Sequence, residues 1–329
     1  MEQAIKDLYN DNILHETMQR YHIAPDDIWA LDGFENLIYE FRRGDKNYIL
    51  RITHSIRRTP DLIRGEVDWI NTLADGGVSV ARAIPSEQGN LVELVDDAQG
   101  GSFLATAFVK APGRRPWEVG WTPERYERYG ALLGKMHTIA ETYELPNPAW
   151  KRPEWDGSNT EWGRWLPASE ALAFQKYLDV SAYIHSLPKE KTSYGLIHQD
   201  AHQSNFFMDD DGLLTLFDFD DCGYSWFMND IAIVLFYISI EQEDPIEFTH
   251  MFMPHFLRGY RQFHALDANW LKEIPVFLKL RELELYAVMY RDFDVNNIDN
   301  EWCARFMQGR KAKIDADMPV IDVDFEAFA

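Results

Sequence analysis

The sequence predicts an α+β protein with two lobes, a small antiparallel-sheet lobe followed by a larger, mainly helical lobe. Its 329 residues are enough for about two compact units. Between about residues 28 and 110, short stretches of alternating apolar and polar residues are typical of strands. After that, apolar residues recur at steps of three and four, as in amphipathic helices. We expect an amino-terminal lobe at 1–108, a hinge at 109–113 and a carboxy-terminal lobe at 114–329.

The composition predicts a globular chain and disfavours two classes of partner. Apolar residues make up 46% of the sequence, which is ample for a buried core. The 54 acidic residues outnumber the 32 lysines and arginines, and the net charge of −22 would repel nucleic acid and anionic membranes. The first residues lack the apolar core of a secretory signal, and no apolar run approaches the roughly 20 residues that span a bilayer. We therefore expect a cytoplasmic protein without a nucleic-acid or membrane partner.

In the amino-terminal lobe the clearest prediction is a hairpin followed by a helix. Apolar and polar side chains alternate over residues 37–42, a turn follows, and residues 47–53 are again extended. Residues 61–74 change to helical spacing. Glu66 falls on the apolar stripe of this helix, where a half-buried carboxylate needs a cation. Further extended stretches are predicted at 78–84, 90–95 and 102–109.

The carboxy-terminal lobe is predicted to be mainly helical. Thr122 followed by Pro123 is typical of a helix start, and helical spacing continues from there to Ala140. Residues 169–186 and several segments between 230 and 310 have the same spacing. The segment 145–165 is rich in tryptophan, for which packing under an irregular loop and a ligand-facing wall are both open interpretations. Its four tryptophans are Trp150, Trp155, Trp162 and Trp165.

The most informative spacing of polar side chains lies in residues 196–230. Asp200 follows His198 by two residues, Asn205 follows Asp200 by five, and Asp218 follows Asn205 by thirteen. Two short apolar strands around the turn DDDG predict a hairpin that brings Asn205 beside Asp218. The oxygens of these two side chains are ligands that Mg²⁺ prefers. Because Asp200 is suited to accept the proton of an attacking hydroxyl, the set predicts phosphoryl transfer.

This segment resembles the catalytic and metal loops of the aminoglycoside phosphotransferase and choline kinase family, whose members share the protein-kinase-like fold. The resemblance covers roughly residues 28–300 and implies a bilobal, ATP-dependent kinase. It implies that Asp200 is the catalytic base and that Asn205 and Asp218 bind Mg²⁺. It also implies supporting roles for His198 and Asp230. For Asp230, which begins a predicted helix, a simple helix N-cap is the alternative.

The amino-terminal lobe fits the same resemblance. In the family, a basic residue on the third strand contacts nucleotide phosphates and is held by a helix glutamate, which implies these roles for Arg51 and Glu66. Lysine is commoner at the strand position, and a plain surface residue is the alternative for Arg51. Residues 33–36 stand where the family covers the nucleotide, although a simple hairpin turn explains them as well. The connector residues expected against the adenine are Phe108, Val109 and Lys110.

The phosphate acceptor is predicted to be a small molecule with a hydroxyl. Only eleven residues separate Asp218 from Asp230, which is too few for the activation segment on which protein kinases bind peptides. Family members act on aminoglycosides, amino alcohols and homoserine, and a sugar-like acceptor is also considered. For a cationic acceptor, the candidate contacts are Asp221, Glu282 and Glu284, each with a solvated face or a salt bridge as its alternative.

Three other functions are weighed against this one. A Ser/Thr protein kinase would use the same two lobes. A non-catalytic nucleotide-binding scaffold would have lost at least one of the three key side chains. The run His198-x-Asp200-x-His202 is compatible with a metal-dependent hydrolase, but a second ligand cluster at recognisable spacing is missing from the sequence.

Overall fold

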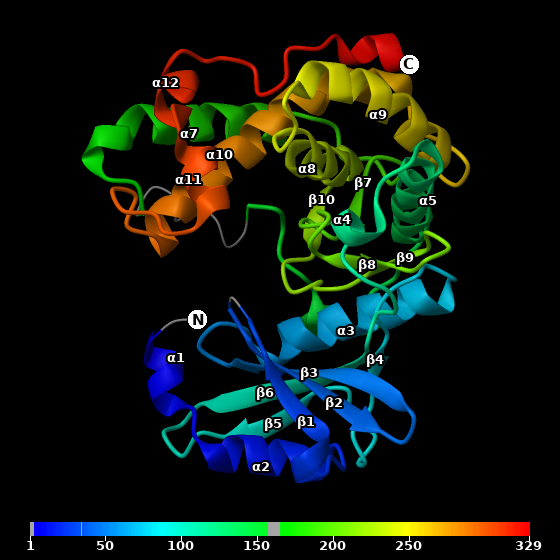
Figure 1. Cartoon of the computed structure of the whole chain (residues 1–329), viewed down its shortest axis with the longest axis vertical. Helices are drawn as coiled ribbons and strands as arrows, with labels where there is room; N and C mark the ends of the chain where they lie inside the picture. The colour runs from blue at the N-terminus through cyan, green and yellow to red at the C-terminus, as the bar shows by residue number, and fades with distance from the viewer. Residues whose placement is uncertain (1–2, 34, 157–164) are drawn as a thin grey trace. The chain divides into compact units, whose positions relative to one another are not determined.

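A computed structural model describes residues 3–33, 35–156 and 165–329 (Figure 1). The chain forms two compact units. The first, here called the sheet unit, comprises Met1–Val119, Tyr143–Arg152 and Phe206–Asp220. The second, the helical unit, comprises Gly120–Thr142, Pro153–Asn205 and Asp221–Ala329. The lobe boundaries expected at residues 109–113 stay a prediction.

An antiparallel sheet is the centre of the sheet unit. Within the described residues its strands run in the order β1-β2-β3-β6-β4, with β5 also paired to β6. The predicted hairpin is confirmed, because β2 and β3 pair from Leu37 opposite Ile52 to Arg43 opposite Lys46. Of the stretch predicted at 78–84, only its last two residues form a sheet strand. The strands are β1 (Ile28–Leu31), β2 (Leu37–Arg43), β3 (Lys46–His54), β4 (Ala83–Ile84), β5 (Glu93–Asp96) and β6 (Ser102–Val109).

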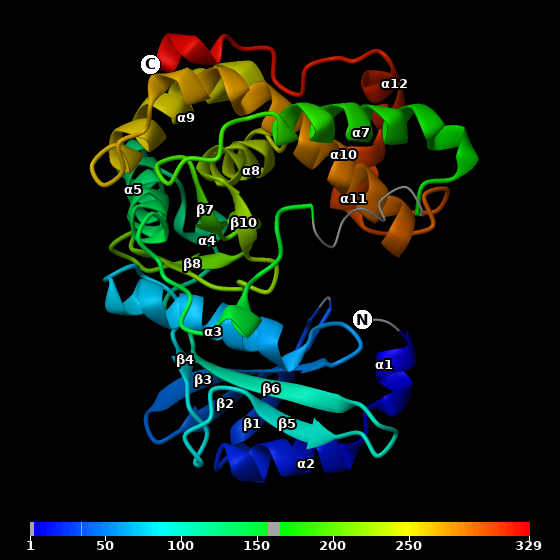
Figure 2. The same cartoon turned by 180° about the vertical axis from the view of Figure 1, so that it is seen from behind.

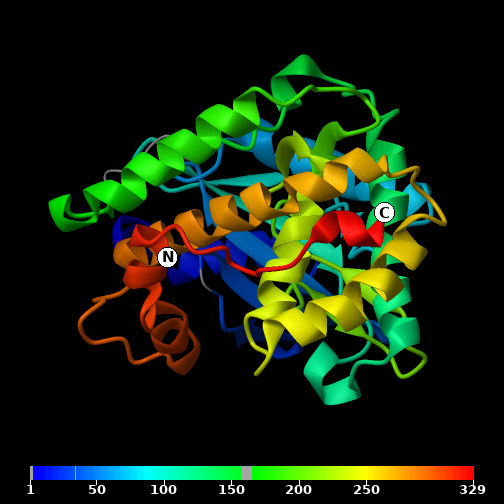
Figure 3. The ribbon, with the colours of Figure 1, turned by 90° about the horizontal axis from the view of Figure 1, so that it is seen from above.

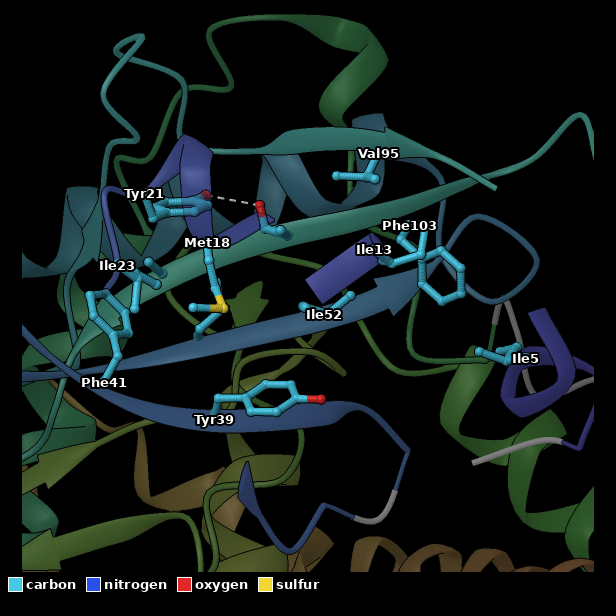
Figure 4. Close-up of a cluster of buried hydrophobic side chains, with 13 residues drawn as sticks. Ile5, Ile13, Met18, Tyr21, Ile23, Tyr39, Phe41, Ile52, Val95 and Phe103 are labelled. Atoms are coloured by element: carbon cyan, nitrogen blue, oxygen red, sulfur yellow. Dashed lines mark hydrogen bonds between the residues drawn. The ribbon is translucent and has the colours of Figure 1, made fainter. Parts of the chain in front are cut away.

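Helices cover both faces of this sheet (Figure 2). On one face, α1 (Gln3–Leu8) and α2 (Asp11–Arg20) pack onto an apolar cluster that includes Leu50 and Ile52 of β3 (Figure 4). The predicted helix, α3 (Pro60–Asp75), lies on the other face. Because side chains alternate along a strand, Arg51 between these two residues faces α3.

The hairpin predicted around the turn DDDG is also confirmed, and it belongs to the sheet unit. Strand β8 (Phe206–Met208) pairs with β9 (Leu214–Leu216), with Phe206 opposite Leu216. Its outer edges are held by main-chain bonds, since Arg114 exchanges hydrogen bonds with Met208, and Ala81 donates to Leu216. A short helix, α4 (Pro116–Val119), and a 3₁₀ turn at Pro148–Trp150 complete the unit.

The helical unit is built around α8, of which nearly every residue is buried. A short ladder of β7 (Tyr194–Ile197) and β10 (Gly223–Trp226) packs beside it. Figure 3 shows α7 and α10 running side by side along one edge of this unit. No helix of the described residues is both long and apolar enough to cross a membrane. The helices are α5 (Pro123–Ala140), α7 (Ala171–His185), α8 (Phe227–Ser239), α9 (Pro245–Tyr260), α10 (Ile274–Asp292), α11 (Glu301–Met307) and α12 (Arg310–Asp315), with 3₁₀ turns at Pro25–Asp27 in the sheet unit and at Ala168–Glu170, Ala268–Glu273 and Phe325–Phe328 here.

One tryptophan of the 145–165 segment can be assigned to packing. Trp155 is 1% exposed, and its ring lies 6.3 Å from that of the equally buried Trp226. For this residue the interpretation as packing under a loop is confirmed. Trp162 lies outside the described residues.

Two glycines allow α5 and α9 to pack backbone against backbone. A Cβ atom on Gly259 would lie 1.7 Å from the carbonyl oxygen of Glu127, and one on Gly130 would lie 1.8 Å from that of Phe256. We expect Gly259→Ala to lower the free energy of unfolding by about 1 to 3 kcal/mol, because a backbone carbonyl cannot rotate away as a side chain can. Urea unfolding would measure this. The exposed helix variant Gln175→Ala is the control, and equal stability of the two variants would contradict the prediction.

Candidate active site

Asp230 anchors the loop that follows β7 in the helical unit. This carboxylate is fully buried, and its Oδ2 and Oδ1 accept hydrogen bonds from the amides of His198 (3.0 Å) and Gln199 (2.7 Å). Helix α8 begins at Phe227 with Trp226 as its N-cap, so the N-cap alternative for Asp230 is wrong. Gln199 adopts a left-handed φ of 66°, a conformation that such bonds help to hold. The loop that carries Asp200 is thereby tied to the core.

A second buried histidine, His137, contacts Asp230 and was not predicted from the sequence. His137 of α5 contacts Asp230 Oδ2 through Nε2 at 3.2 Å and the hydroxyl of Tyr260 through Nδ1 at 2.7 Å. The Tyr260 hydroxyl can donate to Nδ1, which leaves the proton on Nε2 to point at the carboxylate. The support of the loop therefore extends into the helix pair α5 and α9.

The Asp200 carboxylate is surrounded by hydrogen-bond donors. Asn205 Nδ2 donates to Asp200 Oδ2 (2.8 Å) and to its main-chain oxygen (2.9 Å), and His202 Nε2 lies 3.2 Å from Oδ2. Arg281 of α10 contacts the other oxygen, Oδ1. Burial by itself would raise the pKa of Asp200, but the charges of His202 and Arg281 outweigh it and hold this pKa well below its usual range. The carboxylate is ionised and fixed in orientation.

His198 supports this loop through a ring nitrogen. Its ring is fully buried, and Nδ1 accepts the amide hydrogen of Asp200 at 3.2 Å. In the parts of the chain that the structure describes, no group of three or more His, Cys, Asp or Glu side chains is arranged to hold a metal ion. The hydrolase interpretation of the His198-x-Asp200-x-His202 run therefore gains no support.

Asn205 has the orientation that an oxygen ligand of a divalent cation would need. Because its amide nitrogen is directed at Asp200, the amide oxygen Oδ1 faces elsewhere, and no described residue donates a hydrogen bond to it. Asp218, which belongs to the sheet unit, has an exposed carboxylate on a residue with a left-handed φ of 63°. A carboxylate and an amide oxygen suit a hard cation. That Asn205 and Asp218 lie side by side stays a prediction.

In the sheet unit, Arg51 and Glu66 form a buried bidentate ion pair. Arg51 Nη1 and Nη2 donate to Glu66 Oε1 and Oε2, both at 2.7 Å. The two residues are 4% and 0% exposed, so the surface alternative for Arg51 is wrong. Burial would lower the pKa of Arg51, but the charge of Glu66 and the hydrogen bonds to it raise this pKa above its ordinary value. Asp220 and Asp218 add to the rise, which places both aspartates near Arg51.

Asp220 is a buried charged residue of this unit that sequence reasoning missed. It is 4% exposed, Arg57 Nη2 contacts its Oδ2, and Arg58 Nε lies 3.4 Å from its Oδ1. Burial would raise its pKa, but Arg58, Arg57 and then Arg51 outweigh this and lower it. The sequence signal was its position two residues after Asp218. Burial between arginines could not be predicted from that spacing.

Arg57 also ties the turn at 33–36 to Asp220. The same Nη2 contacts Glu35, and Nη1 donates to Asn36 Oδ1 at 3.4 Å. A Cβ atom on Gly33 would lie 2.2 Å from the carbonyl oxygen of Asn36, so only glycine fits this tight turn. Phe34 lies outside the described residues. The predicted nucleotide-covering turn is thus anchored beside the Arg51 site.

The connector residues lie at the end of β6. Phe108 is buried, with its ring 5.2 Å from the Arg51 guanidinium carbon, whereas Val109 is exposed. The amide of Val109 donates to Arg82, and the amide of Lys110 donates to Asn47. Lys110 Nζ also pairs with Glu40 at 2.7 Å. An adenine ring here would therefore need main-chain groups other than these two amides.

The three acidic residues considered for a cationic acceptor have different surroundings. Glu282 is 1% exposed and pairs with Lys279 and Arg310, both at 2.7 Å, so its salt-bridge alternative is confirmed. Asp221 is exposed. Glu284 is buried, and Arg281 Nη1 is its ion-pair partner at 3.8 Å. Arg281 itself had no sequence signal, because it sits inside a helix without a clear apolar stripe.

Comparison with known proteins gives likenesses across nearly the whole chain. The family described as "Phosphotransferase enzyme family" matches residues 30–270. An amicoumacin kinase of Bacillus subtilis (strain 168) is 39% identical over 327 residues, 98% of this chain and 97% of that protein. A solved structure of an amicoumacin kinase in complex with AMP-PNP, Ca²⁺ and Ami has a TM-score of 0.95, 35% identity and 100% coverage of both chains. A microcompartment-associated aminopropanol kinase shares the fold, with a TM-score of 0.75, 24% identity and coverage of 93% and 96%.

Proposed function

The chain belongs to the phosphotransferase enzyme family, and from this premise we propose that it transfers the γ-phosphoryl group of ATP to a hydroxyl of amicoumacin or a closely related small molecule. The observation that supports the acceptor is the likeness to amicoumacin kinases over the full length of the chain. A kinase of small molecules with a hydroxyl is what the family supports; the particular acceptor and the roles below are the proposal.

In this proposal Asp200 accepts the proton of the attacking hydroxyl. Transfer passes through a loose transition state, so the protein chiefly positions the reactants and offsets charge. The low pKa of Asp200 agrees with this, because little basicity is needed until the hydroxyl has begun to bond to phosphorus. The bonds from Asp230 to the loop amides and from Asn205 to the carboxylate hold Asp200 in one orientation.

Asn205 and Asp218 would hold the divalent ion, and Arg51 would contact the nucleotide phosphates. The ion, when bound, neutralises charge on the phosphate oxygens. The outward amide oxygen of Asn205 and the exposed carboxylate of Asp218 fit that role. Glu66 engages both terminal nitrogens of Arg51, which fixes the plane of the guanidinium before a phosphate arrives.

The short link between Asp218 and Asp230 favours a small acceptor over a peptide. In the structure most of this stretch forms strand β10 and the first turn of α8. Its residues are therefore part of regular secondary structure. In protein kinases the corresponding stretch is an activation segment that binds the peptide. To phosphorylate a protein, this chain would have to bind the peptide on a different surface.

The acceptor can be tested with γ-labelled ATP. Purified protein with Mg²⁺ would be incubated with amicoumacin, aminopropanol, hydroxylysine, homoserine and an aminoglycoside, and the labelled product separated from ATP. Transfer to amicoumacin is expected at the highest kcat/KM. Cell protein as acceptor tests the protein-kinase alternative. If label enters protein but none of the small molecules, the proposal is overturned. If no acceptor is labelled, the non-catalytic scaffold is favoured.

The metal role makes a separate prediction for Asp218→Ala. Mg-ATP stabilises the folded protein in proportion to its affinity, and loss of a metal ligand should reduce this stabilisation. We expect the rise in melting temperature with Mg-ATP to fall by more than half. Asp179→Asn on the exposed face of α7 is the control. An undiminished rise in Asp218→Ala would show that this residue is not a metal ligand.

A further inference from the structure

Glu284 is a buried carboxylate whose partner lies at long range. Its side chain is 9% exposed. Its ion-pair partner, Arg281 Nη1, stands 3.8 Å from Oε2. Burial outweighs the attraction of Arg281 and, with the charges of Asp200 and Asp221, raises the pKa of Glu284 to about 7. A carboxylate has about four acceptor sites, so with one long contact Glu284 can accept further hydrogen bonds.

The guanidinium of Arg281 is bonded through Nη2, but its buried Nε has no hydrogen-bond partner among the described residues. Arg281 Nη2 contacts Asp200 Oδ1 and donates to the hydroxyl of Tyr237 at 2.9 Å, and its carbon lies 5.1 Å from the Tyr237 ring centroid. The spare donors of Arg281 and the spare oxygens of Glu284 therefore lie next to each other, beside the Asp200 carboxylate.

The spacing of the two side chains suits one bridging group. At 3.8 Å, Nη1 and Oε2 are too far apart for a strong hydrogen bond, and an oxygen at about 2.7 to 2.9 Å from each would lie to one side of the line that joins them. Such a group must accept from Arg281 and donate to Glu284. A hydroxyl or a carboxamide does both. An ammonium cannot accept and is repelled by the guanidinium, whereas a carboxylate cannot donate and is repelled by Glu284 in its ionised form.

We propose that Arg281 and Glu284 form a subsite for a second hydroxyl or a carboxamide of the phosphate acceptor. The inference rests on the proposed function, because the reacting hydroxyl must sit at Asp200. One guanidinium touches Asp200 and faces Glu284, so the second group lies only a few bonds from the hydroxyl that is phosphorylated. The subsite would select acceptors with two neighbouring polar groups over simple amino alcohols.

Two acceptors that differ by one hydroxyl test the selectivity. These are 2-amino-1,3-propanediol and 2-amino-1-propanol, each measured by ADP release. Because an unpaired buried polar group is costly, we expect wild-type kcat/KM to favour the diol by at least about tenfold. Glu284→Met should reduce this preference to about twofold or less, with the KM for ATP unchanged. Glu284→Gln should retain most of it, because its amide oxygen still accepts a hydrogen bond.

The outcomes separate the possible occupants. Glu273→Met is the matched control, since Glu273 is as buried as Glu284 but binds Tyr183, and it should keep the wild-type preference. If Glu284→Met also keeps that preference, the subsite does not exist. If Glu284→Gln loses as much as Glu284→Met, an ammonium is the occupant and the proposal is wrong.

A binding measurement covers the case in which the proposed function fails. If wild-type protein phosphorylates neither compound nor amicoumacin, the kinase proposal falls, and both compounds are titrated calorimetrically into protein with Mg-AMP-PNP. Tighter binding of the diol in wild type but not in Glu284→Met would still support the subsite. Equal binding of the two compounds by wild type would overturn it.

Discussion

Asp200→Asn is expected to lower kcat by about 10²- to 10⁴-fold, the range that a positioned general base contributes. An amide has nearly the same shape as the carboxylate, and its oxygen can still accept the bonds of Arg281 or Asn205. It cannot take a proton from the acceptor hydroxyl. Because Asp200 is not proposed to bind the nucleotide, the affinity for Mg-ATP should change by no more than a few fold.

The measurement pairs turnover with nucleotide binding. Steady-state rates with amicoumacin give kcat, and a thermal-shift titration with Mg-ATP reports whether the nucleotide still binds. Asp218→Ala should instead weaken the stabilisation by Mg-ATP. This difference distinguishes the proposed base from the proposed metal ligand. Asp179→Asn controls for loss of one acidic charge. Turnover within about threefold of wild type in Asp200→Asn would remove the general-base role.

The second large effect is expected on stability, from breaking the Arg51 and Glu66 pair. Both side chains are buried and bonded to each other through two hydrogen bonds of 2.7 Å. Removing one partner leaves an uncompensated charge inside the sheet unit, which typically costs 3 to 5 kcal/mol, so we expect Arg51→Met to lower the free energy of unfolding by about that amount. Glu66→Leu should do the same.

The double variant Arg51→Met/Glu66→Leu distinguishes stability from function. A buried ion pair replaced by apolar side chains is often close to neutral, so the double variant should regain most of the stability that either single change loses. It should not regain affinity for Mg-ATP, because the guanidinium that we propose to contact the phosphates is gone. Denaturant unfolding and nucleotide titration of all four proteins complete the cycle. Recovery of nucleotide affinity in the double variant would contradict the phosphate role of Arg51.

The surroundings of Arg51 could be predicted in part from the periodicity of strands and helices. Its place on the third strand and the place of Glu66 on a helical stripe were readable, because strands alternate every two residues and helices repeat every 3.6. Periodicity showed only that Glu66 needed a cation, and the family resemblance implied that this cation is Arg51. The apolar residues on either side of Arg51 needed a covering layer, but α2, which provides it, precedes the strands and was not predicted. Its N-cap at Asn10 was the available signal.

Asp230 shows where local rules mislead. A carboxylate at the start of a helical stretch suits an N-cap, yet the helix begins three residues earlier and the carboxylate serves amides 31 and 32 residues away along the chain. Arg281 carries no local signal, and the position of Asp220 two residues after Asp218 did not show that Asp220 is buried. Each acquires its partners from elements far away in the sequence, and charge by itself cannot distinguish a solvated side chain from a buried one.

The order and spacing of residues by themselves determined the α+β class, the β2–β3 hairpin, helix α3 and the β8–β9 hairpin. All of these depend on near neighbours in the chain, where dihedral preferences and side-chain period act directly. Only the tertiary structure decided that Arg281 reaches Asp200, that Glu284 is buried with Arg281 as a distant partner, and that arginines enclose Asp220. Those facts follow from which surfaces are buried together, and burial is a property of the packed chain rather than of any segment of it.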